Sequence, residues 1–169
     1  CQISQKLKKK GKIYWKNILS ILNQTYSSFE IIYSDDGSID KTLEIIEKYK
    51  ENFKSEEVNI KLIKNKHKGP SATRNRGIQN SNHEWIAFID SDDEWESNKL
   101  ESVANILNNT NQYNCIVHNE FFKKIDGSVV NLDHKKQFKE NKLIFNQLFV
   151  KNFLSTSSVT IQKKLIVNA

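Results

Sequence analysis

The sequence has little of what a membrane-spanning or disulfide-stabilised protein needs. Its 169 residues include two cysteines, one proline, five glycines and no methionine. Cys1 and Cys115 provide neither a disulfide framework nor a metal-ligand spacing, so a reducing compartment is the simpler expectation. We interpret Cys115, which lies in an apolar run, as a small core residue. No apolar run is long enough to span a bilayer, and the basic first residues lack the apolar core of a signal peptide.

The composition is that of one globular domain, with 37% hydrophobic and 27% charged residues. A formal net charge of +6 favours anionic partners such as nucleotide diphosphates, nucleic acid or an anionic membrane face. Much of the excess comes from lysines in residues 1–12, an atypical basic N-terminal segment that we interpret as a solvated arm. Because the sequence does not begin with methionine, we expect a fragment or a trimmed product.

The most informative stretch is Glu84–Trp95, where an apolar run is followed by clustered acids. The run is typical of a strand that is buried on both faces of a mostly parallel sheet. Asp90, Asp92 and Asp93 follow it directly, at the end where such sheets bind ligands. Their oxygens suit a hard ion such as Mg²⁺ or Mn²⁺. A solvated turn that caps the next helix is the alternative interpretation.

A second predicted strand, residues 29–34, also runs into acids. Asp35 and Asp36 follow it and precede Gly37, which permits a tight turn with positive φ. Strand–helix alternation up to about residue 107 predicts right-handed crossovers and a mainly parallel sheet, in which both acidic ends share one edge. Two acidic strand ends at one edge favour a ligand site over a solvated turn.

The periodicity of apolar residues predicts the remaining elements. Helices are expected over residues 14–25, from about 40, from about 71, over 97–107 and over 142–150. Strands are expected over residues 29–34, 59–63, 85–90, 115–122, 128–132 and 157–162. Asp40 is a candidate N-cap, and Pro70 suits a first helical turn. Asp126-Gly127 is a hairpin signal.

The order of these motifs resembles that of the family 2 glycosyltransferases, which have the GT-A nucleotide-sugar fold. The matching stretches are Ile18–Tyr26, Phe29–Ile32, Asp35–Thr42, Gly69–Ile78 and Trp85–Trp95. The resemblance implies an α/β, Rossmann-like, mostly parallel sheet flanked by helices, with a mixed β-hairpin C-terminal part. Residues 13–169 would form an incomplete GT-A domain. Its nucleotide-binding part would cover about 13–110, and the start of its acceptor part about 111–169.

The resemblance also implies a reaction and the residues that serve it. A nucleotide-sugar, expected to be UDP-linked, would donate its glycosyl group with inversion to a glycan or another hydroxyl acceptor. Asp35 and Asp36 would bind the nucleotide base, and Arg74 would lie near the base or the phosphates. Asp90 and Asp92 would be the DxD pair that contacts the ribose and binds a divalent cation, Mn²⁺ or Mg²⁺. Asp93 would support that pair.

Two parts of the family pattern are missing. Residues 1–10 carry too many lysines for the usual buried first strand. The motif that usually supplies the general base is expected beyond Ala169, so the catalytic residue is unknown. The late acids do not match the context of that motif; they are Glu120, Asp126, Asp133 and Glu140. The alternative function is therefore a truncated or degenerate nucleotide-binding relative without turnover.

Other partners and sites receive less support from the sequence. The four histidines have no mutual spacing that suggests a metal site. Nucleic-acid binding is disfavoured by the acids at the expected ligand edge. Trp85 is expected to pack in the core, whereas Trp95 is a candidate for stacking on a ligand. We expect a cytoplasmic location; the basic charge permits peripheral association with the inner membrane face, but no amphipathic anchor is evident.

Overall fold

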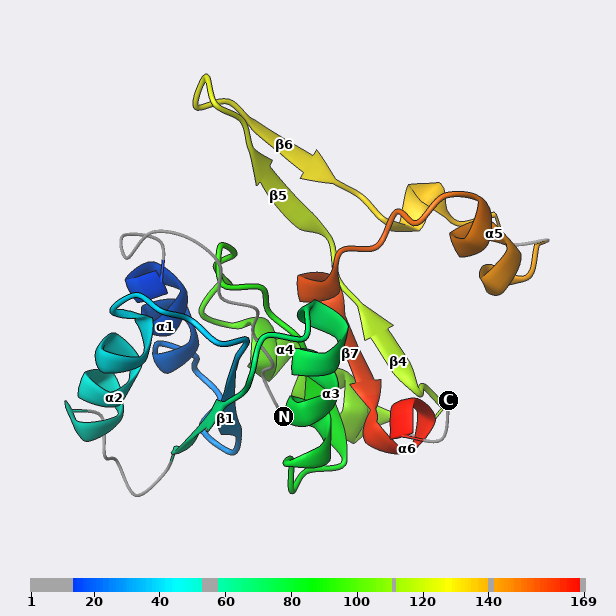
Figure 1. Cartoon of the computed structure of the whole chain (residues 1–169). Coiled ribbons are helices and arrows are strands. Elements are labelled where there is room, and N and C mark those ends of the chain that lie inside the picture. The colour runs from blue at the N-terminus through cyan, green and yellow to red at the C-terminus, as the bar shows by residue number, and fades with distance from the viewer. Residues whose placement is uncertain (1–13, 53–57, 111, 140–141, 168–169) are drawn as a thin grey trace.

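A computed structural model describes residues 14–52, 58–110, 112–139 and 142–167, so the basic segment 1–12 lies outside the described residues (Figure 1). The helices are α1 Tyr14–Leu22, α2 Thr42–Asn52, α3 Pro70–Gln79, α4 Lys99–Asn109, α5 Ile144–Val150 and α6 Lys163–Val167, with 3₁₀ helices η1 Lys135–Gln137 and η2 Thr156–Ser158. The strands are β1 Glu30–Asp35, β2 Asn59–Lys64, β3 Trp85–Ala87, β4 Cys115–Val117, β5 Glu120–Lys123, β6 Val129–Leu132 and β7 Val159–Gln162. The predicted alternation of strands and helices up to α4 is confirmed.

The described strands form a mixed set of sheets. β1 and β2 pair in parallel, with Glu30 opposite Asn59, and α2 connects them. β7 lies between β3 and β4 and is antiparallel to both. β5 and β6 form the predicted antiparallel hairpin, and Gly127 in its turn has φ 84°. The fold is therefore α/β, with a parallel pair near the start and antiparallel strands after α4.

The strand that precedes the acid cluster is shorter than predicted and does not pair with β1. β3 ends at Ala87; Phe88 and Ile89 continue as irregular buried chain, and Asp90 is partly exposed. The N–H of Phe88 still donates to the carbonyl of Val159 (3.2 Å), but the N–H of Asp90 donates to a side chain instead of a strand. In the described pairings, the two acidic ends thus do not share one edge of a single parallel sheet.

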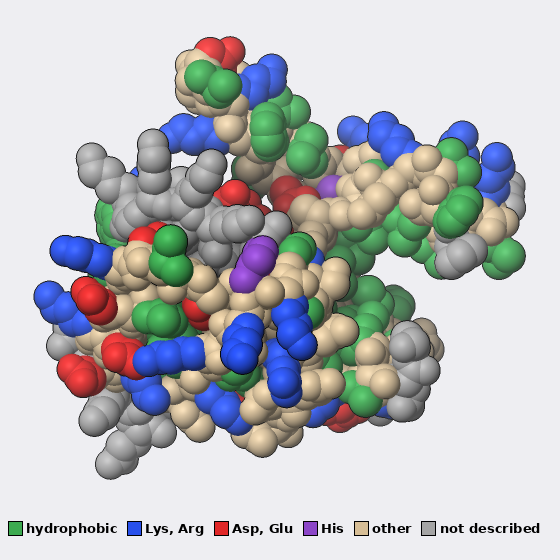
Figure 2. Space-filling model, viewed as in Figure 1, with side chains coloured by type: hydrophobic (Ala, Val, Ile, Leu, Met, Phe, Trp, Pro, Cys, Tyr) green, Lys and Arg blue, Asp and Glu red, His purple; other side chains and the backbone are tan. Residues whose placement is uncertain are grey.

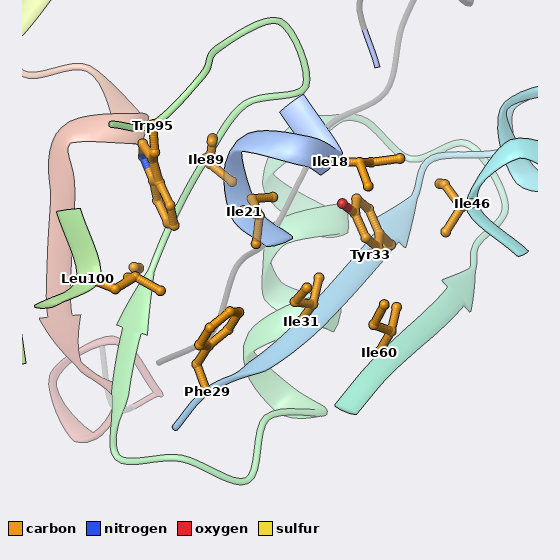
Figure 3. Close-up of a cluster of buried hydrophobic side chains, with 11 residues drawn as sticks. Ile18, Ile21, Phe29, Ile31, Tyr33, Ile46, Ile60, Ile89, Trp95 and Leu100 are labelled. Carbon is orange, nitrogen blue, oxygen red and sulfur yellow. The ribbon is translucent and has the colours of Figure 1, made fainter. Parts of the chain in front are cut away.

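A core of aliphatic and aromatic side chains fixes β1 (Figure 3). Ile18 and Ile21 lie three residues apart on one face of α1 and point toward Ile31 and Tyr33 of β1. All six residues of β1 are buried, as expected for a strand covered on both faces. Each buried isoleucine stabilises the fold by roughly 1.5–3 kcal/mol. The carboxyl end of β1, which carries Asp35, is therefore held by the densest part of the molecule.

An arm projects from this body (Figure 1). We define the arm as residues 120–139 and 142–151, which include β5, β6, η1 and α5. Its large exposed apolar side chains are Phe121, Phe122, Ile125, Val129, Val130, Leu143, Ile144, Phe149 and Val150. Figure 2 shows Lys and Arg side chains along the arm and over this face of the body. None of the described helices has the length and apolar character needed to cross a bilayer.

Three expectations about single residues are corrected by the structure. Cys115 is exposed and has a free thiol, because it lies at the start of β4, an outer strand of its sheet. Trp95, expected to be a candidate for ligand stacking, is only 7% exposed and belongs to the main core. Trp85, expected in the core, is partly exposed. Of the two tryptophans, it is therefore Trp95 that packs in the core.

Candidate functional site

The first part of the site is the turn that follows β1. Oδ2 of Asp35 accepts hydrogen bonds from the N–H groups of Gly37 (3.0 Å) and Ser38 (2.9 Å). Its other oxygen, Oδ1, is buried and has no hydrogen-bond partner. Gly37 has the predicted positive φ, 79°, which only glycine adopts without strain. The turn therefore fixes the Asp35 carboxylate and leaves one of its acceptor atoms unsatisfied.

Asp36 is held by the loop that precedes α3. Its Oδ1 accepts hydrogen bonds from the N–H groups of Lys68 (2.9 Å) and Gly69 (3.2 Å). Its Oδ2 lies 2.9 Å from Nδ1 of His67. Burial by itself would raise the pKa of Asp36, but hydrogen bonds from Lys68, Thr73 and Gly69 and the charge of His67 outweigh it and keep the pKa below its ordinary value. Asp36 is thus an ionised carboxylate in a fixed position.

Helix α3 connects the end of β1 with the acid cluster. The hydroxyl of Ser34 donates to the carbonyl of Thr73 (2.7 Å), which anchors α3 on β1. The next residue, Arg74, pairs with Asp90 at 2.8 Å between Nη2 and Oδ1. The Nε of Arg74 is buried and has no hydrogen-bond partner. Two residues predicted for one site, Arg74 and Asp90, are therefore in direct contact.

We call residues 90–95 the acid loop, and besides Arg74 it is held by side chains from α1 and η2. The side-chain amide of Asn17, in α1, donates to the carbonyls of Asp90 (3.0 Å) and Asp93 (2.7 Å). The hydroxyl of Ser157, in η2, accepts from the N–H of Asp90 (2.9 Å) and donates to Oδ2 of Asp93 (2.5 Å). The loop is therefore fastened to both the start and the end of the described chain.

The carboxylates of the acid loop repel one another. Burial raises the pKa of Asp93, and the charges of Asp92, Asp90 and Glu120 raise it further, although the hydrogen bond from Ser157 opposes them. A cation close to these oxygens would relieve this repulsion, because an opposite charge favours the ionised form. The electrostatics of the loop thus favour a positively charged ligand.

Asp92 is the exposed member of the cluster, and its carboxylate has no recorded hydrogen bond or ion pair with another described residue. Within the described residues, no three His, Cys, Asp or Glu side chains are arranged as a complete metal site. Mg²⁺ and Mn²⁺ do not need one, because such ions often use one or two carboxylates together with substrate phosphates and water. The oxygen donors of Asp92 and Asp90 therefore fit a divalent cation that binds with a diphosphate.

The chain matches the family model described as "Glycosyl transferase family 2" over residues 11–166. The chain belongs to this family. A relative from Rickettsia bellii, described as an uncharacterized glycosyltransferase, is 37% identical over 118 residues. The match covers 69% of this chain but 16% of that relative. The chain thus corresponds to a small part of the longer protein.

Two solved structures show the same GT-A fold. Staphylococcus aureus TarS 1-349 in complex with UDP-GlcNAc has a TM-score of 0.68 and 21% identity, and the match covers 99% of this chain and 46% of that one. The mannosyltransferase PcManGT from Pyrobaculum calidifontis, in complex with GDP-Man and Mn²⁺, has a TM-score of 0.69 and 12% identity, and the match covers 99% and 45%. At these identities the likeness establishes the fold of this family 2 chain.

Sequence reasoning found the acids of this family 2 chain but missed the polar residues that hold them. Asn17 lies in a segment read only as a one-sided apolar helix, and Ser157 in a segment read as a strand. Lys99 was not noticed at all, although it is 7% exposed, lies 3.8 Å from the Trp95 ring centre and donates to Thr160 Oγ1 (3.1 Å). A polar residue inside an otherwise apolar pattern is the one signal that could have identified Asn17.

The late acids do not form an obvious general base. Glu120, at the start of the arm, accepts hydrogen bonds from the hydroxyl of Ser155 and lies 2.8 Å from Nε2 of His134. Asp133 lies 3.7 Å from Nζ of Lys136, and Asp126 accepts from the N–H of Ser128 (2.8 Å) in the hairpin turn. Glu140 lies outside the described residues. Each described late acid thus has a local partner, and we assign no base.

Proposed function

We propose that this family 2 chain binds a nucleotide-sugar, expected to be UDP-linked, and takes part in transfer of its glycosyl group to a hydroxyl acceptor. The observation that carries the proposal is the ion pair between Arg74 and Asp90, 2.8 Å long, because it joins two sequence motifs at one place. The structural neighbours that bind UDP-GlcNAc and GDP-Man support a nucleotide-sugar donor. Because the chain spans less than half of either neighbour, the activity of the whole protein is itself part of this proposal.

Asp35, Asp36 and Arg74 are the residues proposed to bind the nucleotide. Oδ1 of Asp35 is a buried acceptor without a partner, and an N–H of a uracil base would satisfy it. Nε of Arg74 is a buried donor without a partner, and a phosphate oxygen would satisfy it. Buried polar groups are nearly always paired in folded proteins. Two unsatisfied groups with complementary preferences therefore support a nucleotide at this place.

Asp90 and Asp92 are the residues proposed to contact the ribose and a divalent cation. Asp90 is oriented by Arg74, and the exposed Asp92 carboxylate is open to solvent. A bound Mn²⁺ or Mg²⁺ would neutralise the negative charge that develops on the departing diphosphate. In this proposal Asp90 and Asp92 supply oxygen ligands for the cation, and the Arg74 guanidinium binds a phosphate oxygen directly.

The proposed reaction is inverting, and it needs a base that takes the proton of the acceptor hydroxyl. We place nucleotide binding in residues 13–110 and the start of the acceptor part in residues 111–169. The alternative is a degenerate relative that binds nucleotide without turnover, which the unassigned base favours. Release of UDP from a UDP-sugar, measured for this chain and for one extended at both ends, separates the two. If both chains bind UDP and neither releases it from the sugar, the alternative is favoured.

The proposal predicts metal-dependent stabilisation by one nucleotide. Thermal unfolding is measured with UDP, with GDP and without nucleotide, each in Mn²⁺ or in EDTA. Ligand at about 100 times its Kd stabilises a protein by roughly 2.7 kcal/mol, which for a chain of this size raises Tm by about 5–10 °C. We expect this shift with UDP and Mn²⁺ together. An equal shift with GDP would contradict the choice of base.

Asp92→Ala tests the metal role of the acid loop. We expect it to abolish the Mn²⁺-dependent part of UDP binding and to leave the Tm of the free protein unchanged, because Asp92 is exposed. Glu94→Ala is the matched control, since it removes an equally exposed acid from the same loop. Isothermal titration in Mn²⁺ and in EDTA measures both variants. Unchanged Mn²⁺-dependent affinity in Asp92→Ala would overturn the metal assignment.

A further inference from the structure

Ser157 contacts the acid loop at its beginning, its middle and its end. Its hydroxyl accepts from the N–H of Asp90 (2.9 Å) and donates to Oδ2 of Asp93 (2.5 Å). Its carbonyl accepts from the indole Nε1–H of Trp95 (3.2 Å). Ser157 is only 3% exposed, so water does not compete freely for these hydrogen bonds. One residue thus fixes the loop at three points.

The geometry points to Ser157 as a positioning residue that holds the acid loop in the shape needed for metal-dependent nucleotide binding. The inference rests on the proposed function, because Asp90 and Asp92 are the residues whose positions it sets. A hydroxyl has one proton to donate and lone pairs to accept with, and Ser157 uses both functions on the same loop. In known metal sites, substituting a residue that hydrogen-bonds to the metal ligands commonly lowers metal affinity or activity.

The hydroxyl also counteracts repulsion within the loop. The carboxylate of Asp93 is partly buried near the carboxylates of Asp90 and Asp92. The hydrogen bond from Ser157 keeps it turned toward η2. Without that donor, repulsion would move Asp93 away and displace its neighbours. The backbone of the loop would still be held by Asn17, so we expect loosening of the loop rather than unfolding of the protein.

The neighbouring Ser158 provides a matched control. Ser158 is 0% exposed, and its hydroxyl donates to the carbonyl of Ser155 (2.9 Å), the residue that precedes η2. Ser158→Ala therefore removes a buried hydroxyl from the same 3₁₀ helix, as Ser157→Ala does, together with one local hydrogen bond. It removes no recorded hydrogen bond to the acid loop. A difference between the two variants reports on the loop and not on the general cost of losing a buried serine.

The first measurement is amide hydrogen exchange over residues 88–98 without ligand. Ser157→Ala removes two hydrogen bonds to the acid loop and should accelerate exchange there by at least about 3- to 10-fold, the effect of a single lost hydrogen bond, and Ser158→Ala should not. The second measurement is UDP affinity in Mn²⁺ and in EDTA. Ser157→Ala should weaken the Mn²⁺-dependent part by about 10- to 100-fold, as the loss of a supporting partner does in other metal sites. Affinity in EDTA should fall by much less, because Asp35 and Asp36, which are proposed to bind the base, have supports other than Ser157.

Each result of these two measurements either supports or overturns the positioning role of Ser157. Unchanged loop exchange in Ser157→Ala, or equal loss of Mn²⁺-dependent affinity in both serine variants, would overturn the positioning role while the proposed function stands. Absence of Mn²⁺-dependent UDP binding in the unsubstituted chain would overturn the proposed function and the functional part of this inference together. The exchange measurement needs no ligand, so it distinguishes these two failures.

Discussion

At the scale of single residues, the most unusual group is the buried amine of Lys99. Nζ lies 3.8 Å from the centre of the Trp95 ring and donates to Thr160 Oγ1, so an aromatic face and a hydrogen-bond acceptor both suit its ammonium form. Burial nevertheless lowers its pKa to about 7, because neither partner replaces the lost hydration fully. The charge of this lysine thus changes near neutral pH, directly behind the acid loop.

Lys99 should make stability depend on pH. Its folded pKa is below its unfolded value, so between about pH 7 and pH 10 the unfolded chain binds more protons and stability rises with pH. This single group contributes at most about 1.4 kcal/mol per pH unit. In urea unfolding at several pH values, we expect Lys99→Met to lack this rise. Lys48→Met, an exposed position, controls for the lost charge, and parallel curves for wild type and Lys99→Met would contradict the prediction.

The acids of the site were predictable from the sequence, and their supports were not. Asp36, Arg74 and Asp90 occur in local motifs that a single segment reveals. Asn17 and Ser157 lie 64 to 76 residues away from the acid-loop residues that their side chains contact. Asn17 acts through its side-chain amide and Ser157 through its hydroxyl. Hydrogen bonds between such distant positions leave no periodic signal, because each depends on a single polar side chain.

At the scale of elements, the turn after β1 depends on a close approach between two backbones. A Cβ at Gly37 would lie 3.0 Å from the backbone nitrogen of His67, in the loop that holds Asp36. Gly127, in the hairpin turn, has a similar φ of 84°, but a Cβ there would meet nothing within 4 Å. Comparing substitutions at the two glycines therefore separates the cost of positive φ from the cost of a steric contact.

We expect Gly37→Ala to cost more stability than Gly127→Ala. Strain at positive φ alone costs about 1–2 kcal/mol for alanine, and this is the expected effect at Gly127. At Gly37 the contact with His67 adds to it and displaces the loop around Asp36, so UDP affinity should fall as well. Urea unfolding and titration with UDP measure both. Equal losses of stability in the two variants would show that the loop moves aside without cost.

Element types followed from the sequence, whereas pairing partners did not. Apolar periodicity predicted one strand over residues 115–122, but the chain divides there into β4 and β5. The reason is that β4 pairs with β7 and β5 pairs with β6, so the strand changes partner between Val117 and Glu120. Alternation of side chains describes a strand's faces and not its neighbours. For the same reason the sequence predicted β1 and β3 in one mainly parallel sheet, whereas β3 pairs with β7 in an antiparallel arrangement.

At the scale of the whole molecule, the arm is the part that packs least against the rest of the described chain. Among the described strands, β5 and β6 pair only with each other, and Ile125 at their turn is fully exposed. Such segments open locally at low free energy, whereas the core around β1 opens only with the whole fold. The arm and the body should therefore differ in their resistance to proteases.

Limited trypsin digestion should cut the arm first. Lys123 ends β5 and Lys124 begins the hairpin turn, and Lys136 in η1 has an 84% exposed side chain. Within residues 14–167, we expect the earliest cuts, identified by mass spectrometry, at these lysines, because exposed loop tips are preferred cleavage sites. Arg74 and Arg76 in α3 should be cut later. First cleavage within α3 would mean that the body opens more readily than the arm.

Because Ser157 holds the acid loop through hydrogen bonds, the loop cannot be completed until Ser157 has been synthesised. Ser157 leaves the ribosome 64 residues after Asp93, which at 5–20 residues per second is a delay of roughly 3–13 seconds. During that interval the nascent chain carries the clustered acids without their hydroxyl donor and without β7, the partner of β3. Under the proposed function, the site for a donor nucleotide would therefore stay incomplete until Ser157 and β7 have been synthesised.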